Sequence, residues 1–565
     1  MTKIFSLSFG KILLLACLIA LNISCKNTAE NKEIDPNIVL WTPYNDSLEV
    51  VANAEHENGR MRYKLIQSKV LDKNDVFRPL YYEVSQFSDE RYAEMKPMVL
   101  EQDISTIQNH IAQSKFSYEE LVLFYLKRIY KYELENSTTL NTVIALNPDV
   151  LEEARNLDKN GKGLHPIYGM PILLKDNIGT KHMKTTAGAI ALQQNRTDDA
   201  FIVERLKENG ALILGKVNLS EWAYFLCSGC PVGYSAVGGQ TLNPYGRRVF
   251  ETGGSSSGSG TSVAANYAVA AVGTETSGSI LSPSSQNSVV GLKPTIGLLG
   301  RTGIVPISST LDTPGPMTRN VTDNAILLSA MMGHDVRDKA SVKENYTGIY
   351  TSGERPIPLK ELKLGVFKGL MENDSIYNAT ITKLKDAGAE IVEFAPPEVD
   401  MSGFLSILNI DMRNDLPDYI DAEVQDKGAV KIASIKDAVA FNNQDSLVRI
   451  PYGQALFEGI LADSTSTEEL VEIKERLQTN GRIYFNEAMD KHDLDAILSI
   501  NNYHAGFAAV AKYPALTIPM GYKVTGEPIS LTFIGKQFSE GNLLRMGKAF
   551  EDLTKVRKIP QGYKE

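Results

Sequence analysis

Apolar residues recur with helical spacing near the start of the folded part of the chain. Ile104, Ile107 and Ile111 fall on one helical face, and the stretch SYEELVLFYLKRIYKYE from Ser117 repeats such a face. Ser117 and Glu120 have the spacing of a capping box, in which each side chain binds the other residue's backbone N–H. The pattern therefore predicts two consecutive helices.

Strand and helix patterns then alternate along the chain. NTVIAL and PILLK have the composition of strands, and between them DVLEEARNLDKNGKG has a helical pattern that ends on glycine. TSVAANYAVAAVGTET changes from helix to strand, and KLGVF, ATITKLKDAG and AEIVEF form a strand, a helix and a strand. Residues 401–495 are mostly helical and polar, and YPALTIPMGY and ISLTFIG precede a last helix. This alternation favours an α/β fold.

Composition and charge narrow the class of protein. The chain has 565 residues, of which 43% are hydrophobic and 22% charged, so it is long enough to bury a large core. The net charge is -10, and no basic stripe with interleaved aromatic residues occurs. Both features argue against a nucleic acid partner and give no surface for anionic membranes.

The first residues have the pattern of a bacterial export signal. Lys3 and Lys11 precede the apolar run 12–21, which is too short to span a bilayer. The SCKN sequence that follows resembles a lipoprotein cleavage site, at which Cys25 would become the acylated N-terminus, although Asn22 replaces the usual aliphatic residue. An ordinary cleaved signal peptide, which would give a soluble secreted protein, is the alternative.

We therefore divide the chain into a lipoprotein-type signal peptide (residues 1–25), a tether or N-terminal extension (26–60) and one enzymatic domain (61–565). The expected location is the cell envelope or periplasm, with the membrane contacted only through the lipid anchor.

Two of the four cysteines lie in the signal, which leaves Cys227 and Cys230 in CSGC. No thioredoxin-like βαβ pattern surrounds them, and an exported protein permits disulfides. We expect a small loop staple or two inert thiols rather than redox catalysis. One CxxC cannot supply four zinc ligands, and no HExxH occurs, so we expect neither a metal nor a cofactor.

The stretch ETGGSSSGSGTS (251–262) is too rich in glycine and serine for an ordinary core element. A flexible linker is one interpretation, whereas a phosphate-binding loop is excluded because no GK[ST] lysine is present. Residues 254–258 also match the nucleophile elbow G-x-S-x-G, with His504 as a histidine farther along the chain. An α/β-hydrolase esterase is therefore an alternative, although neither an apolar strand nor an HGGG loop precedes the match.

Several ordered motifs carry a more specific resemblance. GMPILLKDNI, GGSSSGSG, GTETSGSILSPSSQNSVVGLKPTIGLLGRTGIVPIS and LDTPGPM closely resemble the amidase signature family of serine hydrolases, in particular its peptide amidase-like branch. The resemblance covers residues 100–335 and returns in YPALTIPMGY and FIGKQFSE. It implies a single large α/β domain, a mixed β-sheet covered by helices and a Ser-Ser-Lys catalytic set.

Carried over position by position, the resemblance implies that Ser279 is the nucleophile, Ser255 the bridging serine and Lys175 the base. The spacing of 24 residues between the two serines selects Ser255 over Ser256 and Ser257. In this family the peptide bond that enters the bridging serine is cis.

The chemistry explains why these residue types are needed. A serine hydroxyl becomes a good nucleophile only when a neighbour takes its proton, and a lysine takes a proton only when it is neutral. Burial in the apolar strand PILLK would lower the pKa of Lys175, whereas Asp176 would oppose this if it pointed the same way. The backbone N–H groups of Thr276, Ser277 and Gly278 would hold the oxyanion.

Two departures from the family pattern bear on the site. Ser277 stands where many members carry glycine, and it would be strained if that position needs a positive φ. Leu281 stands where members that act on small acidic substrates carry arginine, so we expect a neutral carboxamide, such as a peptide amide, as substrate. Lys293 and Asp312 belong to the same motifs, and we interpret both as structural.

Two further hypotheses remain open at this point. A lipid-anchored binding protein could use an inactive amidase scaffold, although all three catalytic residues are present. A transamidase subunit acting on charged tRNA is disfavoured by the export signal, the acidic charge and the missing arginine.

Overall fold

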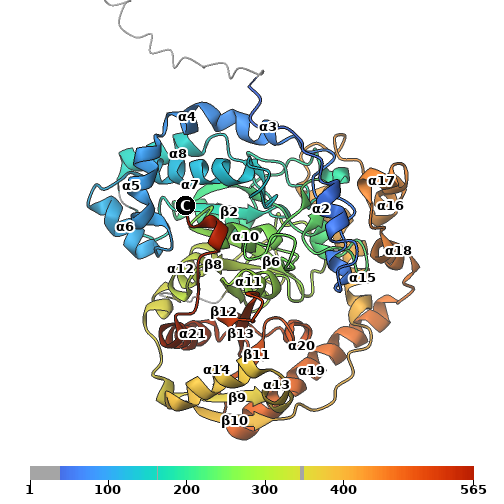
Figure 1. Ribbon diagram of the computed structural model, residues 1–565. Helices are drawn as coiled ribbons and strands as arrows, with labels where there is room; N and C mark the ends of the chain where they lie inside the picture. The colour runs from blue at the N-terminus through green and yellow to red at the C-terminus, as the bar shows by residue number, and fades with distance from the viewer. Residues whose placement is uncertain (1–37, 162, 344–348) are drawn as a thin grey trace, which may run out of the picture. The chain divides into compact units, whose positions relative to one another are not determined.

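The computed structural model describes residues 38–161, 163–343 and 349–565, and its compact unit is Val39–Glu565 (Figure 1). The predicted signal peptide, Cys25 and residues 26–37 of the predicted tether lie outside the described residues. Among the described residues, no helix is both long and apolar enough to cross a membrane.

A mixed sheet forms the centre of the unit and confirms the predicted fold class. Within the described chain it has 11 strands, in the order β1-β3-β2-β6-β8-β7-β12-β13-β11-β9-β10. Parallel pairs join β3, β2 and β6 near one edge and β11, β9 and β10 at the other, and the pairs between β6 and β11 are antiparallel. The strands are β1 (Val143–Leu146), β2 (Pro171–Lys175), β3 (Leu212–Val217), β6 (Ala270–Glu275), β7 (Val290–Lys293), β8 (Thr313–Thr318), β9 (Lys363–Phe367), β10 (Glu390–Phe394), β11 (Ala496–Ile500), β12 (Ala515–Tyr522) and β13 (Pro528–Ile534).

Helices surround this sheet (Figure 1). They are α2 (Ser47–Ala52), α3 (Lys73–Phe77), α4 (Tyr81–Gln86), α5 (Asp89–Val99), α6 (Ile104–Ala112), α7 (Tyr118–Glu133), α8 (Val150–Asn160), α9 (Phe201–Glu208), α10 (Ser257–Ala264), α11 (Leu281–Gln286), α12 (Val321–Met331), α13 (Lys368–Asn373), α14 (Ser375–Asp386), α15 (Phe404–Glu423), α16 (Ile435–Asn443), α17 (Ser446–Arg449), α18 (Ala455–Ala462), α19 (Thr467–His492), α20 (Ala505–Ala511) and α21 (Glu540–Thr554). A short hairpin, β4 (Tyr234–Ser235) and β5 (Gly239–Gln240), lies outside the main sheet.

The helix signals in the sequence correspond to real helix ends. Helix α7 begins after Ser117, and both hydrogen bonds of the predicted capping box to Glu120 are present. Helix α8 ends at Gly161, whose φ of +82° lies in the left-handed region that favours glycine. Local capping therefore fixes where these two helices begin or end.

The described part of the N-terminal extension packs onto the domain. The side chain of Trp41 is 8% exposed, and its indole N–H donates to Asn136 Oδ1 at 2.8 Å. Farther along, the side-chain amide of Asn53 donates to the carbonyl oxygen of Arg248 at 2.9 Å. The compact unit consequently includes residues 39–60, which the sequence division assigned to the extension.

The helical segment α15–α19 follows β10 and precedes β11, and its described residues add no strand to the main sheet. Its apolar residues, such as Leu416 and Phe457, form a second hydrophobic cluster with Trp222 and Leu311. Figure 1 shows α15–α18 gathered to the right of the central strands.

Candidate functional site

The candidate base lies at the carboxyl end of a central strand. Lys175 is the last residue of β2, whose five residues are all buried, and its side chain is 0% exposed. Strand β6 runs parallel beside β2 and brings Thr274 next to Lys175. The chain therefore places a lysine amine inside the sheet, away from water.

The contacts of Lys175 suit a neutral amine. Its Nζ donates to the carbonyl oxygen of Thr274 at 3.0 Å and to Thr274 Oγ1 at 2.8 Å, and it lies 2.7 Å from Ser255 Oγ. A neutral amine has two hydrogens and one lone pair, so the two Thr274 oxygens can take the hydrogens and leave the lone pair for the Ser255 hydroxyl. This is the arrangement that a base needs toward a serine.

Burial also gives Lys175 a suitable pKa. Desolvation lowers the pKa of Lys175 from 10.5 to about 7, against the opposing effect of the Asp312 and Glu275 carboxylates. Asp176, which would raise the pKa of Lys175 if the two side chains met, has other partners. It accepts a hydrogen bond from the Thr186 N–H at 3.1 Å and pairs with Lys216 at 3.5 Å.

The bridging candidate Ser255 sits at a tight turn before α10. The Gly254–Ser255 peptide bond is cis, in agreement with the resemblance, and Ser255 is 0% exposed. A Cβ on Gly254 would lie 2.5 Å from a methyl group of Val232 and 2.6 Å from Ser220 Oγ. The glycine is therefore needed because the backbone passes so close to its neighbours.

The glycine-serine stretch is only partly a loop. Its second half, residues 257–262, forms most of α10. Gly258 lets this helix pass close to Asn218, because a Cβ at position 258 would lie 2.4 Å from the Asn218 carbonyl oxygen. The neighbouring serine hydroxyls have other partners: Ser256 Oγ donates to the Thr274 carbonyl at 3.0 Å, and Ser257 Oγ donates to the Gly253 carbonyl at 2.7 Å. Neither serine binds Lys175, which agrees with the choice of Ser255.

The nucleophile candidate Ser279 lies in the turn between β6 and α11. Its carbonyl oxygen accepts the Ser256 N–H at 3.1 Å, so the two serine segments are joined directly. Glu275 Oε2 accepts the N–H groups of Ile280 at 2.7 Å and Leu281 at 3.0 Å and so fixes the turn. The Ser279 side chain is partly exposed, and its hydroxyl has no hydrogen-bond partner among the described residues.

The candidate oxyanion donors remain free. Within the described chain, the backbone N–H groups of Thr276, Ser277, Gly278 and Ser279 donate no hydrogen bond. Gly278 has a φ of +86°, whereas Ser277 is not among the residues with positive φ, so serine at that position carries no left-handed strain. Unpaired N–H groups beside the nucleophile are what an oxyanion hole requires.

Two neighbours complete the site and are not singled out by the sequence pattern. Thr274 holds the Lys175 amine, and Asn177 donates from Nδ2 to Thr274 Oγ1 at 3.0 Å. Thr274 belongs to the motif GTET and Asn177 to the motif KDN. Their places in these motifs are the sequence signal by which both residues could have been found. Asp312 pins the adjacent loop as expected: its carboxylate accepts the Thr276 hydroxyl at 2.5 Å and the Ile307 N–H at 2.8 Å.

Lys293, the other motif residue interpreted as structural, is also fully buried. Its Nζ donates to the Pro294 carbonyl at 3.3 Å, and burial lowers its pKa to about 8 despite Glu275 and Glu540. It makes no hydrogen bond to either candidate catalytic serine among the described contacts.

A cavity of about 600 Å³ opens beside this site. Asn177, Thr274 and Thr276 line it, and so do Ala223 and residues of α15. Leu281 does not line it: the side chain is 1% exposed and packs in a cluster with Phe367 and Ala505. The sequence argument that placed Leu281 in the substrate pocket is therefore wrong, because the side chain points into the core.

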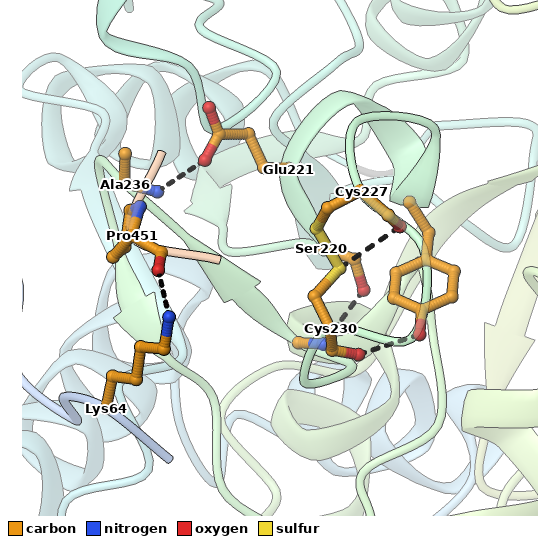
Figure 2. The surroundings of a disulfide bond; sticks show 9 residues. Lys64, Ser220, Glu221, Cys227, Cys230, Ala236 and Pro451 are labelled. Carbon is orange, nitrogen blue, oxygen red and sulfur yellow. Dashed lines mark hydrogen bonds between the residues drawn. A yellow bond between two sulfur atoms is a disulfide. The ribbon is translucent and has the colours of Figure 1, made fainter. Parts of the chain in front are cut away.

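The loop after β3 links the cavity to Ser255. Ser220 donates its backbone N–H to the Ser255 carbonyl at 3.0 Å, and three residues later Ala223 lines the cavity. Figure 2 shows that Cys227 and Cys230 form a disulfide in this loop. The disulfide corresponds to the loop staple, the first of the two expected forms of CSGC, rather than to two inert thiols. Nearby, Ser220 Oγ accepts the Gly233 N–H at 2.8 Å.

The alternatives based on other chemistry do not find a matching site. His504 lies against the ring of Phe367 at 3.9 Å, and its Nδ1 is 2.5 Å from Ser499 Oγ, so it does not serve a Ser256 nucleophile. Burial lowers the pKa of His504 to about 4. In the described residues, no group of three or more His, Cys, Asp or Glu side chains could hold a metal ion.

Comparisons with known proteins identify the family of the chain. The sequence profile described as Amidase matches residues 120–506. A probable amidase of Arabidopsis thaliana is 35% identical over 479 residues, which cover 82% of this chain and 92% of that protein. An amidase family protein from Bacillus anthracis is 38% identical with a TM-score of 0.82, over 88% of this chain and 100% of that chain. The peptide amidase of Stenotrophomonas maltophilia is 35% identical with a TM-score of 0.76, over 82% and 99%. The chain belongs to the amidase family.

Proposed function

We propose that this amidase hydrolyses the C–N bond of a neutral carboxamide, such as a C-terminal peptide amide, through an acyl-enzyme on Ser279. Amide hydrolysis follows from the family and from its peptide amidase neighbour. The observation that carries the residue roles is the buried Lys175 amine, which has a pKa of about 7 and lies 2.7 Å from Ser255 Oγ.

The Lys175–Ser255 contact supports the first proton transfer, and the transfer from Ser279 to Ser255 is part of the proposal. Neutral Lys175 takes the Ser255 proton while Ser255 takes the Ser279 proton, and Ser279 Oγ attacks the amide carbon. The N–H groups of residues 276–279 stabilise the oxyanion. The C–N bond then breaks as Ser255 returns a proton to the leaving amine. Water attacks the resulting ester, Ser279 leaves with a proton, and the carboxylic acid is released.

The charges of the cavity support a substrate without a carboxylate near the scissile bond. The two arginines that line it are already paired: Arg301 binds Asp338 at 2.6 Å, and Arg337 lies 3.5 Å from Glu204. A substrate carboxylate would therefore meet no free cation among the described lining residues.

The residue roles can be tested by ammonia release from a neutral dipeptide amide. We expect Ser279→Ala, Ser255→Ala and Lys175→Met each to lower kcat by about 10⁴-fold or more, since catalytic residues that act as a unit lose most of the rate singly. Ser282→Ala is the matched control, because Ser282 lies three residues after Ser279 and its hydroxyl has no described partner. Near-normal turnover by Ser279→Ala would refute the proposed nucleophile.

The charge preference needs a separate pair of substrates. We expect a higher kcat/KM for a neutral diamide, such as malonamide, than for its half-acid malonamate. A higher value for the half-acid would contradict the neutral-substrate proposal without affecting the residue roles.

We also propose that the protein is exported and anchored to a membrane through an acylated Cys25. The basic residues, the short apolar run and the SCKN site support this proposal. A disulfide between Cys227 and Cys230 is compatible with an oxidising compartment.

A further inference from the structure

The cavity beside the candidate catalytic residues has an unusual balance of charge. Its lining contains six carboxylates and two arginines: Asp198, Asp312, Asp338, Asp415, Asp418, Glu423, Arg301 and Arg337. Both arginines are neutralised by carboxylates, as described above. The uncompensated charge in the cavity is therefore negative.

The carboxylates differ in how they are satisfied. Asp338 is held by Arg301, and both oxygens of Asp312 accept hydrogen bonds from its own loop and Thr276. Asp415 accepts one hydrogen bond, from the Ser309 N–H at 2.6 Å, and Asp418 accepts none from the described residues. Neither Asp415 nor Asp418 forms an ion pair with a described cationic side chain.

Asp415 and Asp418 lie on the same face of α15, because residues three apart are neighbours on a helix. This face lines the cavity together with residues at the ends of β6 and β8. Like charges that line a concave surface reinforce each other's field, so the pair attracts a cation more strongly than either carboxylate alone. The described carboxylates do not converge as a metal-binding group.

Asn177 lies at the catalytic end of the cavity and is 3% exposed. Its Oδ1 has no hydrogen-bond partner in the described chain, but this atom is enclosed by protein and is not presented to the cavity. The unpaired acceptors that the cavity presents are therefore the carboxylates on α15, and its described lining residues include no free cation.

We infer that this cavity binds a protonated amine carried by the substrate, with Asp415 and Asp418 as the residues that select it. The inference rests on the proposed amide hydrolysis and adds that the preferred amides are cationic at a distance from the scissile bond. A lysine-like ammonium group supplies the donors and the charge that the wall lacks.

Three acetylated dipeptide amides test the inference, with lysine, norleucine or glutamate before a common C-terminal alanine amide. The lysine and norleucine compounds differ mainly in charge. We expect kcat/KM to fall in the order lysine, norleucine, glutamate, and the ratio of lysine to norleucine to decrease with rising salt, because exposed charges are screened.

Variants then assign the preference to the wall. Asp415→Asn keeps an oxygen for the Ser309 N–H, and we expect it and Asp418→Asn each to lower the lysine-to-norleucine ratio by about two- to fivefold, the range for partly exposed charge pairs. Asp421→Asn is the matched control on α15, since Asp421 is exposed, pairs with Lys427 and lies outside the cavity.

The outcomes separate this inference from the function on which it rests. A parent enzyme that does not prefer lysine to norleucine would overturn it, and so would an unchanged ratio in both Asp415→Asn and Asp418→Asn. Failure to release ammonia from any of the three amides would instead count against the proposed peptide amide substrate.

Discussion

Burial of Lys175 lowers the stability of the fold and makes the amine a better base at neutral pH. An isolated lysine keeps its proton to a pKa of about 10.4, and burial without a carboxylate partner favours the neutral form. The contacts to Thr274 and Ser255 recover part of the cost, but none of them is an ion pair. The residue is therefore suited to accept a proton at neutral pH and poorly suited to stabilise the fold there.

The first prediction concerns the rate. Because the base must be neutral and its pKa is lowered to about 7, kcat/KM for an uncharged amide should rise with pH through about 7 and then reach a plateau. The substrate should be acetylated, so that it does not titrate in this range. A profile with its maximum below pH 5 would contradict a lysine base.

The second prediction concerns stability. The pKa of Lys175 is about 7 in the folded protein and near 10.5 in the unfolded chain, so between these pH values the unfolded state binds one more proton. The free energy of unfolding of the parent should therefore rise relative to Lys175→Met by about 1.4 kcal/mol per pH unit in this window, and the difference should level off below pH 7.

Denaturant unfolding of both proteins at pH 6, 8 and 9 measures this difference. Using the variant as the reference removes the contribution of other titrating groups. A stability difference that does not change with pH would mean that Lys175 keeps its proton in the fold.

At this scale, the sequence identifies residues that belong to contiguous motifs. Lys175, Ser255 and Ser279 could be named because each stands at a fixed place in such a motif. The environment of Leu281 could not, since whether a side chain after the nucleophile faces the cavity or the core depends on how α20 and β9 pack against it.

At the scale of elements, the position of α10 depends on Gly258 having no side chain. The first turn of α10 lies close to Asn218, the residue after β3, so a Cβ on Gly258 would clash with the backbone oxygen of Asn218. A backbone oxygen cannot move aside as a flexible side chain can. The helix starts at the bridging serine segment, so its position also sets the position of Ser255.

The third prediction follows from this contact. Gly258→Ala should lower the yield of folded protein and the melting temperature, because the clash displaces α10 or the chain at Asn218. Gly459→Ala in α18 is the control: nothing lies within 4 Å of its added Cβ, so the change should stabilise by about 0.5–1 kcal/mol through helix propensity. Equal effects of the two changes in thermal unfolding would refute the steric argument.

The disulfide gives a fourth prediction, for the loop after β3. Closing a loop of four residues corresponds to about 2 kcal/mol of chain entropy in the unfolded state, so Cys227→Ser with Cys230→Ser should lower the free energy of unfolding by about that amount. A reductant should lower the stability of the parent and leave that of the double variant unchanged. Equal stability of oxidised parent and variant would show that the disulfide adds nothing.

Elements with strong local signals could be predicted from sequence, as α7 and α8 show through Ser117 and Gly161. The glycine-serine stretch could not be divided into turn and helix, because its helical half lacks propensity and is held by packing against Asn218 and β6. Tertiary contact overrides local preference there.

For the molecule as a whole, the sheet order brings distant segments together. β2 and β6 are neighbours although about a hundred residues separate them, and this pairing is what joins Lys175 to Thr274. The alternation of strands and helices predicts the fold class, but the order of strands and the cavity wall on α15 are properties of the assembled molecule.

The fifth prediction concerns the location of the whole protein in the cell. If Cys25 is acylated, Cys25→Ser should move the protein from the membrane fraction to the soluble exported fraction. The variant has no thiol at position 25 to carry the lipid that anchors the protein. Fractionation with detection of the protein, and the amidase activity of each fraction, measures this. Retention of the variant in the membrane fraction to the same extent would refute acylation at that site.

The separate position of α15–α19 has a consequence for how this enzyme can change. The acid-base groups are supplied by β2, β6 and the turn before α10, whereas part of the cavity wall comes from a helical insert that contributes no described strand. Mutations at the cavity-facing positions of α15 change this wall without replacing a residue of β2, β6 or the turn before α10. Substrate range and chemistry can therefore diverge independently, and libraries confined to that helix face are the natural starting point for redirecting the enzyme to new amides.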